Sequence, residues 1–143
     1  MNTSGDYSQM KVFEQPELLL DEAQQAVDLA VKAGADFVDA SVSVSKDVSV
    51  AVEKSSIKSS QALWGSGLSI RAYVDGGMGF ATRGGQRDVS VEDLAKRAVD
   101  LARLASADPD FKSLPMPAEP DHVPQTYDPA VAEITPDTII DWA

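Results

Sequence analysis

The residues best suited to catalysis are few in this sequence. A single histidine, His122, lies beside Asp121 in the segment PDHVP, and there is no cysteine. A hydrolytic zinc ion takes about three protein ligands and keeps a fourth position for water. One histidine in a proline-rich segment could ligate a metal, but such a residue is ordinarily solvated. We therefore predict no catalytic residue and no metal site within this sequence.

Glycine-rich and acidic segments suggest two other chemistries. Backbone amides in the segments GSG, DGGMG and RGG could cradle an anion, which leaves open a small-ligand sensor. Neither a Walker lysine pattern nor a GxGxxG motif opening a helix is present. The acid pairs Asp21-Glu22 and Glu92-Asp93 could exchange protons in a cleft. Hairpin turns explain the glycines better, and the positive ends of two helices explain the acids.

The elements that position these residues are organised around residues 64–83, WGSGLSIRAYVDGGMGFATR. Apolar residues alternate with polar ones at Leu68, Ile70, Ala72 and Val74. This period of two predicts a strand with one buried face. The following Asp-Gly-Gly predicts a hairpin turn, because glycine reaches positive φ without a steric clash. On the returning strand we place Met78 and Phe80 on the apolar face and Gly79 and Ala81 on the polar face.

The period is also two before this hairpin. Apolar residues at 38, 40, 42 and 44 alternate with Asp and Ser, and the alternation resumes at 48, 50 and 52 after Lys46-Asp47. We predict one turn at Lys46-Asp47, a second at residues 53–56, and a polar strand over residues 57–63. The result is an antiparallel β-meander of four to five strands.

The polar face of this sheet is the predicted contact surface. A merely solvated face tends to carry Lys and Glu, whereas small residues let another backbone approach closely. Its members are Ser41, Ser43, Ser45, Ser49, Ala51, Ser69, Arg71, Tyr73, Gly79 and Ala81. We expect Arg71, Tyr73, Ser69 and Ser43 to contact a peptide or a partner, either on this face or through strand addition at the sheet edge. The alternative is an ordinary wet sheet, with Arg71 paired to Glu53.

Two helices are predicted to cover the valine-rich face, which makes the domain α+β. Residues 17–33 show apolar positions at steps of three and four, including Leu20 and Val31, and Gly34 follows as a C-cap. Residues 91–106 begin after Ser90, a good N-cap with Asp93 in the capping-box position. Both helices pack on one face of the sheet.

Composition sets the remaining boundaries. Residues 1–15 lack periodicity and read as a disordered tail, so the α+β domain spans residues 16–108. Seven of the eight prolines lie from Pro109 onward, which predicts a proline-rich linker over 109–134 and the start of a truncated helix at 135–143. Twelve Lys and Arg against 23 Asp and Glu give a net charge of −11, which disfavours direct nucleic-acid binding. The absence of long apolar runs and of cysteine favours a cytoplasmic protein without membrane contact.

The order of these elements resembles the N-terminal domain of the TldD/PmbA family, peptidases also called modulators of DNA gyrase. The resemblance is carried by KAGADFVDASV (32–42), VAVEKSSIKSS (50–60), GSGLSIRAYVDGGMGFA (65–81) and SVEDLAKRAVDLARLA (90–105). It implies a longer two-domain protein that forms a homo- or heterodimer with a paralogue. In active members it implies a zinc site of the HExxxH type that cleaves peptides and unstructured proteins. This sequence contains no HExxxH.

The resemblance therefore implies a noncatalytic domain that contributes to dimerisation and to the peptide-substrate groove. Zinc is expected in the full-length protein, outside this fragment, if that protein is the active paralogue. The alternative is a protein-interaction module that modulates DNA gyrase or a toxin–antitoxin system without peptidase activity.

Overall fold

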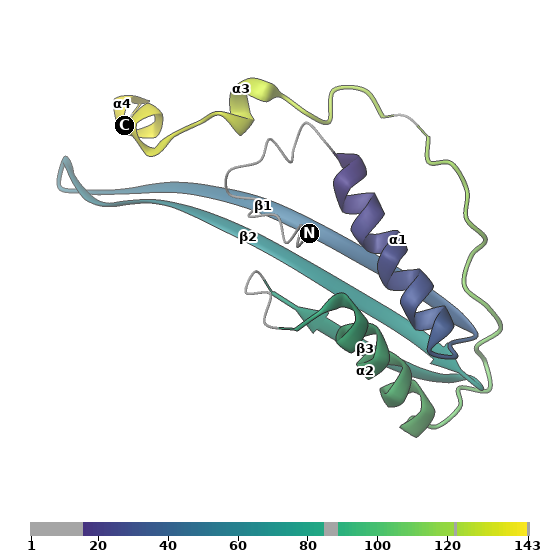
Figure 1. Cartoon of the computed structure of the whole chain (residues 1–143). Helices are drawn as coiled ribbons and strands as arrows, with labels where there is room; N and C mark the ends of the chain where they lie inside the picture. Colours follow the sequence, from purple (N-terminus) through teal and green to yellow (C-terminus); the bar gives the residue numbers. More distant parts are fainter. Residues whose placement is uncertain (1–15, 85–88, 122, 143) are drawn as a thin grey trace. The chain divides into compact units, whose positions relative to one another are not determined.

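The structure is a computed structural model that describes residues 16–84, 89–121 and 123–142 (Figure 1). The elements in chain order are α1 (Pro16–Lys32), β1 (Phe37–Glu53), β2 (Ser56–Val74), β3 (Gly77–Arg83), α2 (Val91–Leu104), α3 (Pro129–Ala132) and α4 (Pro136–Trp142). Contacts divide the described chain into two compact units. Unit 1 holds the residues up to Val44 together with Ser66–Met116, and unit 2 holds Ser45–Gly65 and the residues from Pro117 onward. The long strands β1 and β2 contribute to both units.

The described residues form a three-stranded antiparallel sheet in the order β1-β2-β3, so the prediction of four to five strands was wrong. The predicted turn at Lys46-Asp47 lies inside β1, which is continuous over 17 residues. A two-residue turn there would have placed Val44 and Ser49 opposite each other on one face. A continuous strand instead keeps every even-numbered position on one face, and Val44, Lys46 and Val48 are all half-buried.

Two tight turns connect the strands. The predicted turn after Glu53 is made by Lys54 and Ser55, and the predicted Asp-Gly turn is made by Asp75 and Gly76. All four turn residues have positive φ, between 49° and 81°. Two consecutive residues with positive φ form the turn whose twist matches paired antiparallel strands. At Asp75-Gly76 the loop is only two residues long, because Val74 pairs directly with Gly77.

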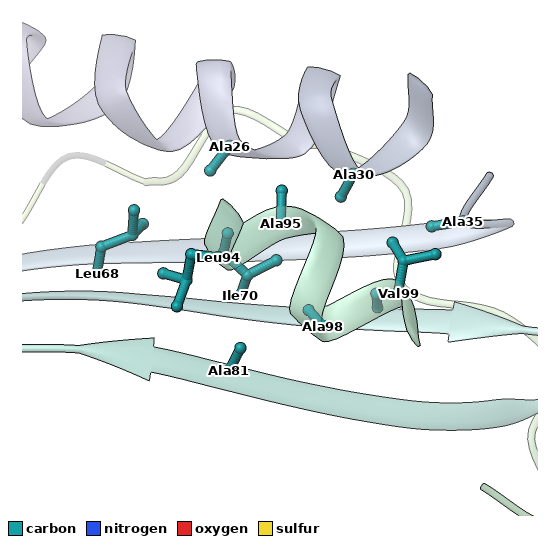
Figure 2. Close-up of a cluster of buried hydrophobic side chains, with 11 residues drawn as sticks. Ala26, Ala30, Ala35, Leu68, Ile70, Ala81, Leu94, Ala95, Ala98 and Val99 are labelled. Carbon is teal, nitrogen blue, oxygen red and sulfur yellow. The ribbon is translucent and has the colours of Figure 1, made fainter. Parts of the chain in front are cut away.

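The core of unit 1 lies between the sheet and the two helices, as predicted. Figure 2 shows Ala26 and Ala30 of α1, with Ala95 and Ala98 of α2, on the same side of the sheet. They meet Leu68, Ile70, Ala72 and Ala81 from the strands. The predicted helix stripe was partly wrong, since Leu20 is 69% and Val31 53% exposed. Among the residues described, no helix is long and apolar enough to cross a membrane.

Helix α2 lies directly on β3 because two glycines leave room for it. A Cβ atom built on Gly79 would come within 2.0 Å of the Ala98 carbonyl oxygen, and one on Gly77 within 2.4 Å of the Ala102 carbonyl oxygen. Such distances are impossible for real side chains, so the helix backbone touches the strand backbone. The predicted N-cap holds the start of this helix, since the Asp93 amide donates to Ser90 Oγ at 3.0 Å.

Unit 2 is built around a lysine on the apolar face of β1. The Lys46 ammonium donates to the carbonyl oxygens of Ala132 and Ile134, each at 2.8 Å. It also lies 5.6 Å from the ring centroid of Trp64. The two carbonyls belong to the end of α3 and the residues just after it, where helix carbonyls lack intrahelical partners. Lys46 lies among the valines of β1 because its ammonium binds the segment that contains α3.

We predict that Gly79→Ala lowers the free energy of unfolding by about 1–3 kcal/mol or more, because the new methyl group must push α2 off the sheet. Gly84→Ala is the matched control, since a Cβ at Gly84 would meet nothing within 4 Å. Chemical denaturation followed by circular dichroism measures both changes. Equal effects of the two substitutions would contradict the close approach of α2.

We predict that Lys46→Met releases the segment that contains α3 and α4 and leaves the hairpin of β1 and β2 folded. The methionine keeps the apolar stem but removes the ammonium that holds two carbonyls. Hydrogen exchange should then speed up at residues 131–140 and stay unchanged in α2. Lys58→Met is the control, because the Lys58 ion pair with Glu53 is mostly exposed and contributes little.

Candidate functional site

The candidate site is the face of the unit 1 sheet opposite α1 and α2, which we call the open face. Its residues follow from strand alternation, from the register of β2 with β3, and from contacts between β1 and β2. They are Asp39, Ser41, Ser43, Gly67, Ser69, Arg71, Tyr73, Met78, Phe80 and Thr82. The open face thus includes all four residues predicted to contact a peptide or partner, Ser43, Ser69, Arg71 and Tyr73.

The returning strand β3 has the opposite orientation to that predicted. Gly79 and Ala81, predicted on the polar face, are buried under α2. Met78 and Phe80, predicted on the apolar face, are 47% and 53% exposed on the open face. The reason is the register, in which Ala72 pairs with Gly79 and therefore shares its face. The two-residue loop Asp75-Gly76 fixes this register. A loop of this length, recognised in the sequence, would have predicted the correct orientation of β3.

Arg71 is held by a carboxylate on the neighbouring strand. Its Nε donates to Asp39 Oδ2 at 3.0 Å, and its Nη2 contacts the same oxygen. The side-chain hydrogen bond to Asp39, followed by the charge of Asp39, raises the pKa of Arg71 above its ordinary value. The alternative of a cross-strand pair for Arg71 is therefore confirmed, but its partner is Asp39 and not the suggested Glu53, which pairs with Lys58 at 2.8 Å. Arg71 is thus oriented by β1, and its charge is already balanced.

Tyr73 is covered on one side by a residue that the sequence did not single out. The Tyr73 ring stacks on Phe111, with centroids 3.8 Å apart and planes 3° from parallel. Phe111 also meets Phe37 edge to face at 5.6 Å. The segment that carries Phe111 is fixed near by, where the Asp108 amide donates to the Gly76 carbonyl at 2.9 Å. Phe111 therefore closes this end of the open face.

The middle of the open face is flat. Ser43 lies beside Gly67, where an added Cβ would be 3.5 Å from the Ser43 hydroxyl oxygen. Next along β2, the Ser69 hydroxyl lies 3.1 Å from the Thr82 hydroxyl. Hydroxyls and a glycine leave the backbone accessible here. The flat part is bordered by the Arg71–Asp39 pair, and the exposed ring of Phe80 lies on β3 opposite Arg71.

Structural contacts explain two of the acidic residues that could exchange protons, Glu22 and Asp93. Glu22 pairs with Arg83 at 2.5 Å in a nearly buried ion pair that joins α1 to β3, so this acid is structural. The Glu92-Asp93 pair is exposed in the first turn of α2. His122 lies outside the described residues. Among residues 16–84, 89–121 and 123–142, no three His, Asp or Glu side chains lie close enough together to hold a metal ion.

The fold and the site together define an α+β domain. Two helices cover one face of an antiparallel sheet, and the second face is flat. Residues 38–102 match the family model described as PmbA/TldA metallopeptidase domain 1. Over these 65 of its 143 residues, the chain is similar to the first domain of the TldD/PmbA metallopeptidase family. No curated protein matches the chain.

A solved structure supports the fold. The crystal structure of TldE from Thermococcus kodakarensis is similar with a TM-score of 0.71, 24% sequence identity, and coverage of 81% of this chain. The likeness covers 26% of that protein, so this chain spans about a quarter of its length. At this identity the similarity establishes the architecture.

We predict that Phe111→Ala lowers the free energy of unfolding of unit 1 by about 1–3 kcal/mol, because it removes two aromatic contacts and the apolar area that they bury. Met116→Ala is the control, since Met116 is 85% exposed. Denaturation with intrinsic tyrosine and tryptophan fluorescence measures the change. If the two variants were equally stable, Phe111 would not be anchored on Tyr73.

Proposed function

We propose that this chain is the noncatalytic N-terminal domain of a TldD/PmbA-type metallopeptidase, and that its open face forms part of the groove that holds a peptide or unstructured protein substrate. A role in dimerisation belongs to the same proposal. The observation that supports a peptide-binding groove is the flat row formed by Ser43, Gly67 and Ser69. An extended chain can lie closely on such a row, because no large side chain holds it away.

The borders of the row support a peptide rather than a small ligand. Phe80 offers an exposed apolar surface on one side, 53% accessible to solvent. Arg71 donates to Asp39, but its side chain remains about 43% exposed. Its other N–H groups can therefore still donate to a peptide carbonyl. No deep pocket is needed for such a contact, since an extended chain binds through its backbone and alternate side chains.

The zinc expected for active members would lie outside the residues of this chain. The described side chains bring together no three potential ligands, and the sequence has a single histidine. The chain would therefore contribute binding surface and the rest of the protein the chemistry. Measured zinc content at one ion per chain together with peptide cleavage by this chain would overturn that division.

We predict that the chain binds a basic, unstructured peptide of about ten residues weakly, with a Kd of about 10⁻⁴–10⁻³ M, because the net charge of −11 attracts it and one flat face offers a small contact area. Ser43→Trp should weaken binding at least about tenfold by filling the flat row. Backbone amide shifts in a nuclear magnetic resonance titration should centre on β1 and β2.

The control is Gln25→Trp, which adds the same ring to the exposed side of α1. It should leave the affinity unchanged. Shifts centred on α1, or equal weakening by both variants, would show that the peptide does not use the open face.

A further inference from the structure

The open face is made of cross-strand pairs that differ in chemistry. Between β2 and β3, Ser69 pairs with Thr82, and two residues further along β2 Arg71 pairs with Phe80. The first pair presents two hydroxyls, and the second presents a guanidinium and a phenyl ring. The flat row of the proposed groove therefore ends beside a pair of side chains that can make a different kind of contact.

The side chains of Arg71 and Phe80 start from closely spaced positions. Val74 and Gly77 close the two-residue turn as a hydrogen-bonded pair, and antiparallel strands alternate between hydrogen-bonded and non-hydrogen-bonded pairs. Arg71 and Phe80 lie three pairs further on, so they form a non-hydrogen-bonded pair. The Cβ atoms of such a pair are about 5 Å apart. Both side chains are about half exposed, so one ligand group can contact both.

The Arg71 guanidinium is suited to hold an aromatic ring. Asp39 contacts its Nε and Nη2 from β1, which fixes the orientation of the guanidinium and balances its charge. A guanidinium that donates within its own plane still presents its flat faces, and these faces stack on aromatic rings. An acidic ligand would gain less here, because Arg71 is already paired and the chain carries a net charge of −11.

The chain itself places an aromatic ring next to this pair. Phe111 stacks on Tyr73, which lies two positions along β2 from Arg71 on the same face, with ring centroids 3.8 Å apart. This end of the open face therefore accepts an aromatic ring from another segment. Tyr73 is already covered by Phe111, whereas Arg71 and Phe80 remain exposed. The Arg71–Phe80 pair is thus the neighbouring position at which a further aromatic ring can bind.

We propose that the Arg71–Phe80 pair binds an aromatic side chain of the peptide that lies on the open face. This inference rests on the proposed groove and names the class of peptide that the groove selects. The peptide ring would stack on the Arg71 guanidinium and contact the Phe80 ring. Ser69 lies two positions from Arg71, which is about 7 Å along a strand. An extended peptide would therefore carry its aromatic residue about two to four positions from the residues that cover the flat row.

Nuclear magnetic resonance titration of the 143-residue chain with a set of matched peptides tests this specificity. Each peptide is basic, unstructured and about ten residues long, and the peptides differ only at one central position, which is phenylalanine, leucine or alanine. The phenylalanine peptide should bind about three- to tenfold more tightly than the alanine peptide, because it adds an aromatic contact and a cation–π contact. The leucine peptide offers apolar area without a π face, so its Kd should lie closer to that of the alanine peptide.

Variants of the pair locate the site. Phe80→Ala removes the ring, and Arg71→Lys keeps the charge but removes the flat guanidinium. Each should reduce the preference for phenylalanine over alanine to less than about twofold. Leu20→Ala is the matched control, because Leu20 is also exposed but lies on α1, on the other side of the sheet. It should keep the preference of the parent chain, and circular dichroism checks that every variant is folded.

The outcomes separate this site from the proposed groove. Equal affinity for the phenylalanine peptide and either of the other two overturns the aromatic site, and so does a preference that survives both Phe80→Ala and Arg71→Lys. If these equal affinities are still weakened by Ser43→Trp, the groove stands without the site. If the preference depends on Phe80 but Ser43→Trp weakens no peptide, the site stands and the flat row is not part of a groove. A chain that binds none of the peptides overturns both.

Discussion

The contact between the backbone of α2 and the backbone of β3 is the constraint on which the rest of unit 1 depends. Gly77 and Gly79 have no side chains to hold the helix away, and α2 meets them with Ala98 and Ala102. A helix this close can reach the strand only from one face, so it determines which residues of β3 are covered. The open face and the exposure of Phe80 follow from that choice.

Small residues also allow close packing in the rest of the core. Most of the buried side chains are alanines, and the four largest fully buried ones are Leu68, Ile70, Leu94 and Val99. Alanine contributes little area, but it lets helices and strands approach until many atoms are in contact. The nearly buried Glu22–Arg83 pair then joins α1 to β3 at one end of the core. Such a core covers one face of the sheet and leaves the other face available for binding.

Sequence patterns predicted α1, α2 and α4, the turns after Glu53 and Val74, and the side of the sheet that α1 and α2 cover. They missed α3, which lies within the predicted proline-rich linker. The predictions failed where one sequence pattern is compatible with two different structures. Alternation across Lys46-Asp47 fits either a turn or a continuous strand, and only the unchanged phase of the valines favours the strand. On β3, apolar Met78 and Phe80 suggested a buried face, but the register places small Gly79 and Ala81 there. The stack of Phe111 on Tyr73 joins residues far apart in sequence, which no local pattern encodes.

In a strand, side chains point perpendicular to the backbone hydrogen bonds, and both directions alternate with a period of two. Met78, Phe80 and Thr82 point their side chains to the open face and their amides and carbonyls to the outer edge. A strand paired at that edge would extend the open face sideways beyond Phe80. The outer edge of β3 thus borders the open face, because the residues that direct their backbone groups to that edge also direct their side chains to that face.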